Sequence, residues 1–217
     1  EGAKVLKYRT IKQKGEDFYQ LVLNTTPFYP EGGGQVGDTG FLVIDGETYR
    51  VIDTKKENDL AIHYVDRLPD NPEAEVKAVV DAKRRALIEN NHSVTHLMHA
   101  ALRKVLGTHV SQKGSLVKDD YMRFDFAHFS KMTDEEIDEV ERIVNEKIRQ
   151  NIPLQEDRSL DIAKAKEAGA MMLFGEKYGD KVRMITFDPS YSRELCGGCH
   201  VDATGKIGLF KIKSESA

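Results

Sequence analysis

The sequence predicts an α+β protein in which a small N-terminal β-barrel-like subdomain, residues 1–72, precedes an α/β subdomain, residues 73–217. Two observations support this division. Up to Pro72 the chain consists of short runs, rich in β-branched or aromatic residues and bounded by turn residues, which is typical of strands. Beyond it, stretches of good helix formers carry apolar residues at helical spacing and alternate with further strand-like runs.

The first subdomain is expected to contain five strands. Each run is bounded by Gly, Asn, Asp or Pro, the residues that favour turns. The predicted strands are Val5–Lys12, Phe18–Asn24, Phe41–Asp45, Tyr49–Thr54 and Leu60–Val65. Asp70, Asn71 and Pro72 then break the pattern and indicate a domain boundary.

The second subdomain is expected to begin with a long helix, Glu75–Leu106, with Gly107 at its C-terminal cap. Thr133, followed three residues later by Glu136, is a capping-box pattern that predicts a second helix ending before Asn151 and Pro153. A third helix is expected over residues 160–168. Strands are predicted around residues 110, 116, 122–126, 154–158, 182–187 and 207–212.

Composition and charge narrow the function class. The chain is 40% hydrophobic and 31% charged, which fits a globular protein, and no apolar run approaches the roughly 18 residues of a membrane span. The net charge of -4 argues against a wholly basic nucleic-acid binder. Charge is nevertheless segregated, since residues 75–125 are net basic and residues 134–150 are net acidic. Phosphate contacts are therefore expected in residues 75–125. The alternative is that both stretches are simply solvent-exposed helix faces. Because residue 1 is Glu rather than Met, we expect a piece of a longer protein.

Histidine and cysteine spacing predicts a metal site. His92 and His96 lie four apart on the long helix and so share one face. Cys196 and His200, far along the chain, add a thiolate and an imidazole, and this ligand set suits Zn²⁺. The alternative reading is a polar helix face and a tight turn. Cys199 leaves a two-thiolate arrangement with Cys196 open, and two cysteines in one loop favour a reducing compartment over a disulfide framework.

A second notable segment, residues 25–40, is rich in glycine. Glycines allow a backbone to approach a ligand closely, so Gly32, Gly33 and Gly34 could present amide groups to a phosphate or a ribose. The segment matches neither the P-loop nor the dinucleotide fingerprint. Taken alone, such a loop is more often a β-turn.

Together these stretches resemble the editing domain of alanyl-tRNA synthetase and the free-standing AlaX-type deacylases. The resemblance covers essentially the whole chain, with the family's motifs in order. It is carried by FYPEGGGQVGD at 28–38, HSVTH at 92–96 with LMHAAL at 97–102, GTHVSQKGS at 107–115, RFD at 123–125 and ELCGGCHV at 194–201. The C-terminal stretch favours a fragment of the synthetase. One departure is Cys199, where the family usually has threonine.

The resemblance implies hydrolysis of the ester that joins a wrong amino acid, chiefly serine and also glycine, to tRNA(Ala), within a cytoplasmic, ATP-binding parent synthetase. The class II aminoacylation motifs are absent, so this chain should not activate alanine. Thr26 matches the threonine that contacts the serine hydroxyl, and Gln112 a glutamine linked to editing. The matched ligands of one Zn²⁺ ion are His92, His96, Cys196 and His200, with His99 expected beside the site. Gly32, Gly33 and Gly34 would accept the terminal adenosine, and Arg84, Arg85 and Lys113 would contact phosphates of the tRNA(Ala) acceptor end.

The role of zinc stays open at this stage. Four protein ligands are typical of a structural site, whereas a hydrolytic zinc keeps a position for water. The ion either changes its coordination when substrate enters or only fixes the pocket. Two competing hypotheses are a non-catalytic zinc-stabilised tRNA-binding module and the related editing module of threonyl-tRNA synthetase; the glycine-rich segment argues against the latter.

Overall fold

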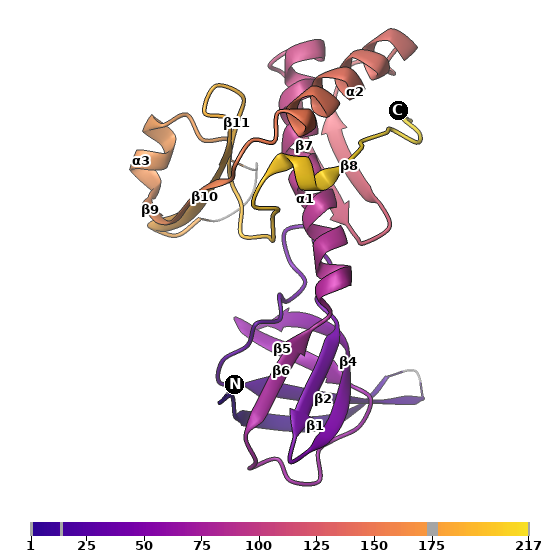
Figure 1. Ribbon diagram of the computed structural model, residues 1–217, viewed down its shortest axis with the longest axis vertical. Helices are drawn as coiled ribbons and strands as arrows, with labels where there is room; N and C mark the ends of the chain where they lie inside the picture. Colours follow the sequence, from indigo (N-terminus) through magenta and orange to yellow (C-terminus); the bar gives the residue numbers. More distant parts are fainter. Residues whose placement is uncertain (1, 14, 173–177, 217) are drawn as a thin grey trace. The chain divides into compact units, whose positions relative to one another are not determined.

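The computed structural model describes residues 2–13, 15–172 and 178–216, and its chain divides into two compact units, residues 1–87 and 88–217 (Figure 1). The predicted α+β class is confirmed: two sheets of six and three strands and a two-stranded hairpin accompany three α-helices in the described residues. No helix in these ranges is long and apolar enough to cross a membrane. The functional division at residue 72 stays a prediction.

The first unit is built on one antiparallel six-stranded sheet with strand order β1-β2-β5-β4-β3-β6. The strands are β1 (Val5–Gln13), β2 (Glu16–Leu23), β3 (Gly40–Ile44), β4 (Glu47–Glu57), β5 (Leu60–Val65) and β6 (Val76–Val80). The first five overlap the predicted strands. Their apolar side chains meet in a core that includes Leu21, Leu42, Tyr49 and Val51, all at most 2% exposed.

Among the described residues, a single bridge connects the two ends of this sheet. Ala3, just before β1, pairs with Val76 at the start of β6, and the Val76 amide donates to the Ala3 carbonyl over 2.8 Å. One bridge is not a continuous ladder, so closure into a barrel stays a prediction.

β6 corrects one expectation. The sequence placed residues 75–81 in the long helix, but residues 76–80 form a strand that pairs with β3 from Gly40↔Val80 to Ile44↔Val76. Lys77 and Ala78 favour a helix, yet the β-branched Val76, Val79 and Val80 suit a strand, and the free edge of β3 offers them backbone partners. The helix α1 therefore begins at Ala82 and ends at Leu106, where Gly107 takes a positive φ of 117°.

The second unit holds most of α1 (Ala82–Leu106), a hairpin and a smaller sheet. Its further elements are β7 (Ser111–Val117), β8 (Met122–Ala127), α2 (Asp134–Arg149), β9 (Gln155–Asp161), α3 (Ile162–Glu167), β10 (Lys181–Phe187), β11 (Ser192–Leu195) and the 3-10 turn η1 (Thr204–Ile207). The capping box of Thr133 and Glu136 is confirmed: each side chain accepts the other's backbone N–H. The core between α1, α2 and the small sheet includes Leu97, Val140 and Phe187.

The C-terminal segment contains a second difference. The predicted strand over 207–212 is absent, and β11, which was not predicted, completes the small sheet with order β11-β10-β9. The backbone of the terminal segment instead bonds to side chains of α2. Asn145 accepts from the amide of Phe210 and donates to its carbonyl, while Glu141 accepts from the amide of Ile212. Side chains of α2 thus replace the partner strand that the pattern suggested.

Candidate functional site

Four side chains from two distant parts of the chain meet in the second unit. His92, His96, Cys196 and His200 place one ligand atom each within 4.8 Å of one another. The two histidines on α1 stack with ring centroids 5.6 Å apart, because four residues make about one helical turn. The predicted convergence of these four residues is therefore confirmed as a possible metal site.

Hydrogen-bond distances indicate which atoms face the centre. The Sγ atom of Cys196 lies 3.4 Å from Nε2 of His92 and 3.3 Å from Nε2 of His200. On the other side of its ring, His200 Nδ1 lies 3.3 Å from the hydroxyl of Ser93. A zinc ion with bonds of 2.0–2.3 Å in a tetrahedron would separate its ligand atoms by roughly 3.5 Å. The two distances from Cys196 Sγ fit such an ion.

The loop after β11 is held in place by contacts to the small sheet and to α1. Arg183 on β10 donates through Nη1 to the carbonyls of Cys196 and Gly198. The amide of Val201 donates to Ser93 on α1 over 3.0 Å. These hydrogen bonds attach the cysteine loop to β10 and to α1. They hold Cys196 and His200 in position in addition to any bonds to a metal.

Glu194 is a site residue for which the sequence analysis assigned no role. Its carboxylate lies 2.8 Å from Nδ1 of His96 and 3.0 Å from Nδ1 of His99, and it is 7% exposed. A carboxylate behind a histidine ring orients the ring and strengthens it as a ligand. Its position two residues before Cys196, on the same side of an extended chain, is a signal that could have identified it. His99 lies beside the cluster, as expected.

Burial and charge shift the protonation of the cluster. Burial lowers the pKa of His200 to about 3. Burial also opposes ionisation of Cys196, yet positive charge at His92 brings the pKa of this thiol well below its usual range. Although burial acts against it, the Glu194 carboxylate raises the pKa of His96. A thiolate and a neutral His200 are forms that bind a metal, whereas His96 would release a proton on binding.

The residues present fit a metal ion. Nε2 of His96 is buried and makes no hydrogen bond within the described part of the chain, and its Nδ1 faces Glu194. A buried ring nitrogen without a protein partner needs another partner, which a cation supplies. Among the described residues, Cys199 does not belong to the group of four, and the two-thiolate arrangement with Cys196 stays an alternative to be tested.

Replacing Glu194 with glutamine is expected to weaken metal binding by about 10–100-fold, because the charge behind His96 is lost while the shape of the side chain is retained. A titration of the apoprotein against a zinc chelator measures this change. Glu141→Gln is the matched control, since Glu141 is also buried in the second unit but bonds Lys211 and Ile212. Equal affinities in the Glu194 variant and the wild type would contradict the assigned role.

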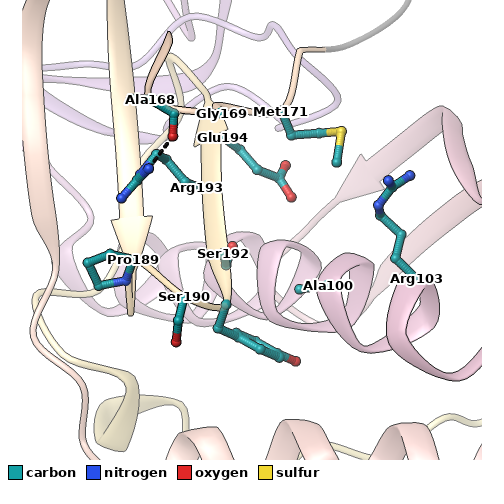
Figure 2. Close-up of a pocket in the computed structure, with 11 residues that line it drawn as sticks. Ala100, Arg103, Ala168, Gly169, Met171, Pro189, Ser190, Ser192, Arg193 and Glu194 are labelled. Carbon is teal, nitrogen blue, oxygen red and sulfur yellow. Dashed lines mark hydrogen bonds between the residues drawn. The ribbon is translucent and has the colours of Figure 1, made fainter. Parts of the chain in front are cut away.

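Glu194 also lines a cavity of about 280 Å³ (Figure 2). Arg193, next to it on β11, donates to the carbonyl of Ala168. The cavity is lined by Ala100, Arg103, Ala168, Gly169, Met171, Pro189, Ser190, Tyr191, Ser192, Arg193 and Glu194. Glu194 thus belongs both to the cavity wall and to the contacts of His96 and His99.

The glycine-rich loop belongs to the first unit. The N–H of Gly32 donates to the carbonyl of Gln35, and the N–H of Gln35 donates to the carbonyl of Gly32. Gly33 and Gly34 have positive φ angles of 57° and 82°. This is a tight turn. Gly37 is required for a steric reason, since an added Cβ would lie 1.9 Å from the Thr54 carbonyl oxygen. Whether the turn contacts a ligand stays a prediction.

Arg84 and Arg85 both contact this loop. Arg85 Nε lies 2.9 and 3.0 Å from the two carboxylate oxygens of Asp38, which is 1% exposed, and Arg84 donates to the carbonyl of Gly37 over 2.9 Å. The Asp38 carboxylate also accepts the Tyr29 amide. The two arginines thus hold the loop, and their predicted contact with phosphate stays a prediction.

The remaining predicted residues lie on separate elements. Gln112 and Lys113 are at the start of β7, where the pairing with β8 shifts register between Gln112 and Gly114. Gln112 is half-buried and Lys113 exposed. Thr26 is half-buried in the first unit, and its hydroxyl oxygen lies 2.8 Å from Nε2 of His63. His63, which the sequence analysis left without a role, is therefore a neighbour of a predicted site residue.

Comparison with known proteins identifies two family models. The model described as "tRNA synthetases class II (A)" matches residues 4–84, and that described as "Threonyl and Alanyl tRNA synthetase second additional domain" matches residues 182–217. Curated relatives named alanine–tRNA ligase include those of Cytophaga hutchinsonii, 61% identical, Bacteroides thetaiotaomicron, 60% identical, and Salinibacter ruber, 51% identical, each over 215 residues. These alignments cover 99% of this chain but only 24%, 24% and 22% of the relatives. The chain thus spans about a quarter of their length.

Proposed function

The chain belongs to the alanine–tRNA ligase family, and from that premise we propose that it hydrolyses the ester of tRNA(Ala) mischarged chiefly with serine and also with glycine. The observation that carries the proposal is the convergence of His92, His96, Cys196 and His200 in one cluster, in which the first two are buried and the other two half-buried. Partners of this activity are the acceptor end of tRNA(Ala) and the remaining domains of a full-length synthetase.

A second hydrolytic site answers a physical need. A pocket built for alanine cannot strongly reject the smaller glycine, and an added hydroxyl also gives only weak rejection of serine. The second site must in turn spare alanine. It can do so with a buried polar group that bonds the serine hydroxyl, because leaving that group unpaired costs about 1–3 kcal/mol. Thr26 is the residue proposed for this contact.

The metal-binding residues are assigned to zinc. A thiolate and three imidazoles, with Glu194 behind His96, form the donor set that this ion prefers. A zinc ion held there would supply either a Lewis acid for the ester or a fixed frame for the pocket. The chain's own residues do the rest: the Gln112 amide orients the ester or a water molecule, and Gly32, Gly33 and Gly34 contact the terminal adenosine. Arg84, Arg85 and Lys113 are proposed to contact phosphates.

The test compares two esters on the same tRNA. The purified zinc-loaded chain is incubated with seryl-tRNA(Ala) and, separately, with alanyl-tRNA(Ala), and the remaining ester is measured over time. We expect the serine ester to be lost at least about tenfold faster, the ratio that one unpaired buried hydroxyl contact produces. Gln112→Ala should slow loss of the serine ester.

A non-catalytic tRNA-binding module is the second candidate, and the closed set of four ligands favours it. It predicts that both esters decay at their spontaneous rates although the chain binds the acceptor stem. That result, with binding demonstrated on the same preparation, would refute the hydrolytic proposal.

A further inference from the structure

A buried histidine fixes the direction of the hydrogen bond at Thr26. His63 on β5 is fully buried, with Nε2 2.8 Å from the Thr26 hydroxyl oxygen and Nδ1 3.1 Å from the carbonyl oxygen of Leu21 on β2. The ring of Phe28 packs edge-on against it with centroids 5.3 Å apart. His63 therefore has a defined polar partner on each nitrogen.

The Leu21 carbonyl determines which nitrogen carries the proton. A carbonyl oxygen only accepts, so Nδ1 of His63 must be the donor. Burial lowers the pKa of His63, which keeps the ring neutral, and a neutral imidazole has one N–H only. Nε2 is then an acceptor. Turning the ring over would place C–H groups against both partners and would leave the polar atoms unbonded.

The hydroxyl of Thr26 is committed as a result. A hydroxyl group can donate one hydrogen bond and accept two. The hydrogen is donated to Nε2 of His63, and the amide of Phe28 donates to the oxygen over 3.1 Å. One acceptor position is left. A ligand that reaches Thr26 can therefore bond it only by offering a hydrogen.

We propose that His63 is a positioning residue that makes Thr26 a hydrogen-bond acceptor, so that the site selects aminoacyl groups whose side chain donates a hydrogen bond. This inference rests on the proposed function for its substrate. The serine hydroxyl can donate, whereas the alanine methyl group cannot and would leave the last acceptor position of Thr26 unpaired. Glycine has no side chain that could contact Thr26, so its hydrolysis is not controlled by this bond.

The first test reads the His63 tautomer directly and needs no substrate. Long-range 1H–15N correlation spectra of the 15N-labelled full chain at neutral pH, with His63 identified by comparison with the His63→Leu spectrum, distinguish the two neutral forms. We expect the form protonated at Nδ1. Protonation at Nε2 would overturn the inference whatever the protein hydrolyses, because His63 would then donate to Thr26.

The second test measures selectivity. The wild type and variants are compared for binding of non-hydrolysable 3′-amide analogues of seryl- and alanyl-adenosine. We expect His63→Leu to lower the preference for serine about threefold, because the Thr26 hydroxyl is then spread over three staggered positions and no longer held as an acceptor towards the ligand. His63→Gln should restore part of the preference, since its amide oxygen can accept from Thr26. Thr26→Val serves as the reference for complete loss of the contact, and thermal melts verify that each variant is folded.

The outcomes separate the two proposals. A wild type without serine preference contradicts the proposed function, while the tautomer spectrum still decides the role of His63. A wild type with serine preference that His63→Leu retains overturns the positioning role and leaves the proposed function intact.

Discussion

Cys196→Ala is expected to remove tightly bound zinc from the protein. Cys196 is the one anionic ligand of the four, and its sulfur lies 3.3–3.4 Å from two imidazole nitrogens. Three neutral imidazoles remain in the variant, and we expect the affinity to fall at least about 100-fold, beyond the loss typical of an outer contact. Because metal binding contributes to folding, the thermal midpoint should also fall towards that of chelator-treated wild type. Metal content by mass spectrometry and thermal melts with and without chelator measure both effects.

Cys199→Thr is the matched control, since it changes the other cysteine of the same loop. Cys199 does not belong to the cluster of four, so the variant should bind as much zinc as the wild type. Equal zinc loss in both variants would show that the two thiolates share the ion, and the ligand set would then have to be revised.

The sequence predicted the metal cluster because its two parts have local signatures. His92 and His96 follow helical periodicity, and Cys196 and His200 lie in one short loop, so only their meeting had to be inferred. His63 had no such signature. Its role arises from the pairing of β5 with β2, which brings it beside Leu21, and from the turn that places Thr26 at its other nitrogen. Such contacts between paired strands depend on the register of the strands, which local sequence patterns do not specify.

The fold was predictable where local preference agrees with the tertiary surroundings. The five strands from β1 to β5 alternate with clear turn residues, and Thr133 marks the start of α2. The sequence was misleading where a distant partner decides. Residues 76–80 carry mixed preferences that the edge of β3 resolves as a strand, and residues 208–212 bond to Asn145 and Glu141 instead of a neighbouring strand.

Arg85→Met is expected to destabilise the first unit by about 3–5 kcal/mol, the usual cost of leaving a buried charge without its partner. The Asp38 side chain is 1% exposed and receives the Arg85 guanidinium on both oxygens. After the substitution the carboxylate keeps the Tyr29 amide but loses its counter-charge. Urea unfolding, followed by a probe in the first unit, measures the loss.

Arg84→Met separates this structural role from contact with nucleic acid. The adjacent Arg84 donates to the backbone carbonyl of Gly37 over 2.9 Å, and losing this hydrogen bond should cost about 1 kcal/mol. Equal destabilisation by both substitutions would contradict the assignment of the buried pair. If Arg84 contacts a tRNA phosphate as proposed, the slope of log K against log salt concentration for tRNA(Ala) binding should become shallower by about one unit in this variant, because one fewer counterion is released. Stability and salt dependence therefore distinguish an arginine that supports the loop from one that binds the tRNA.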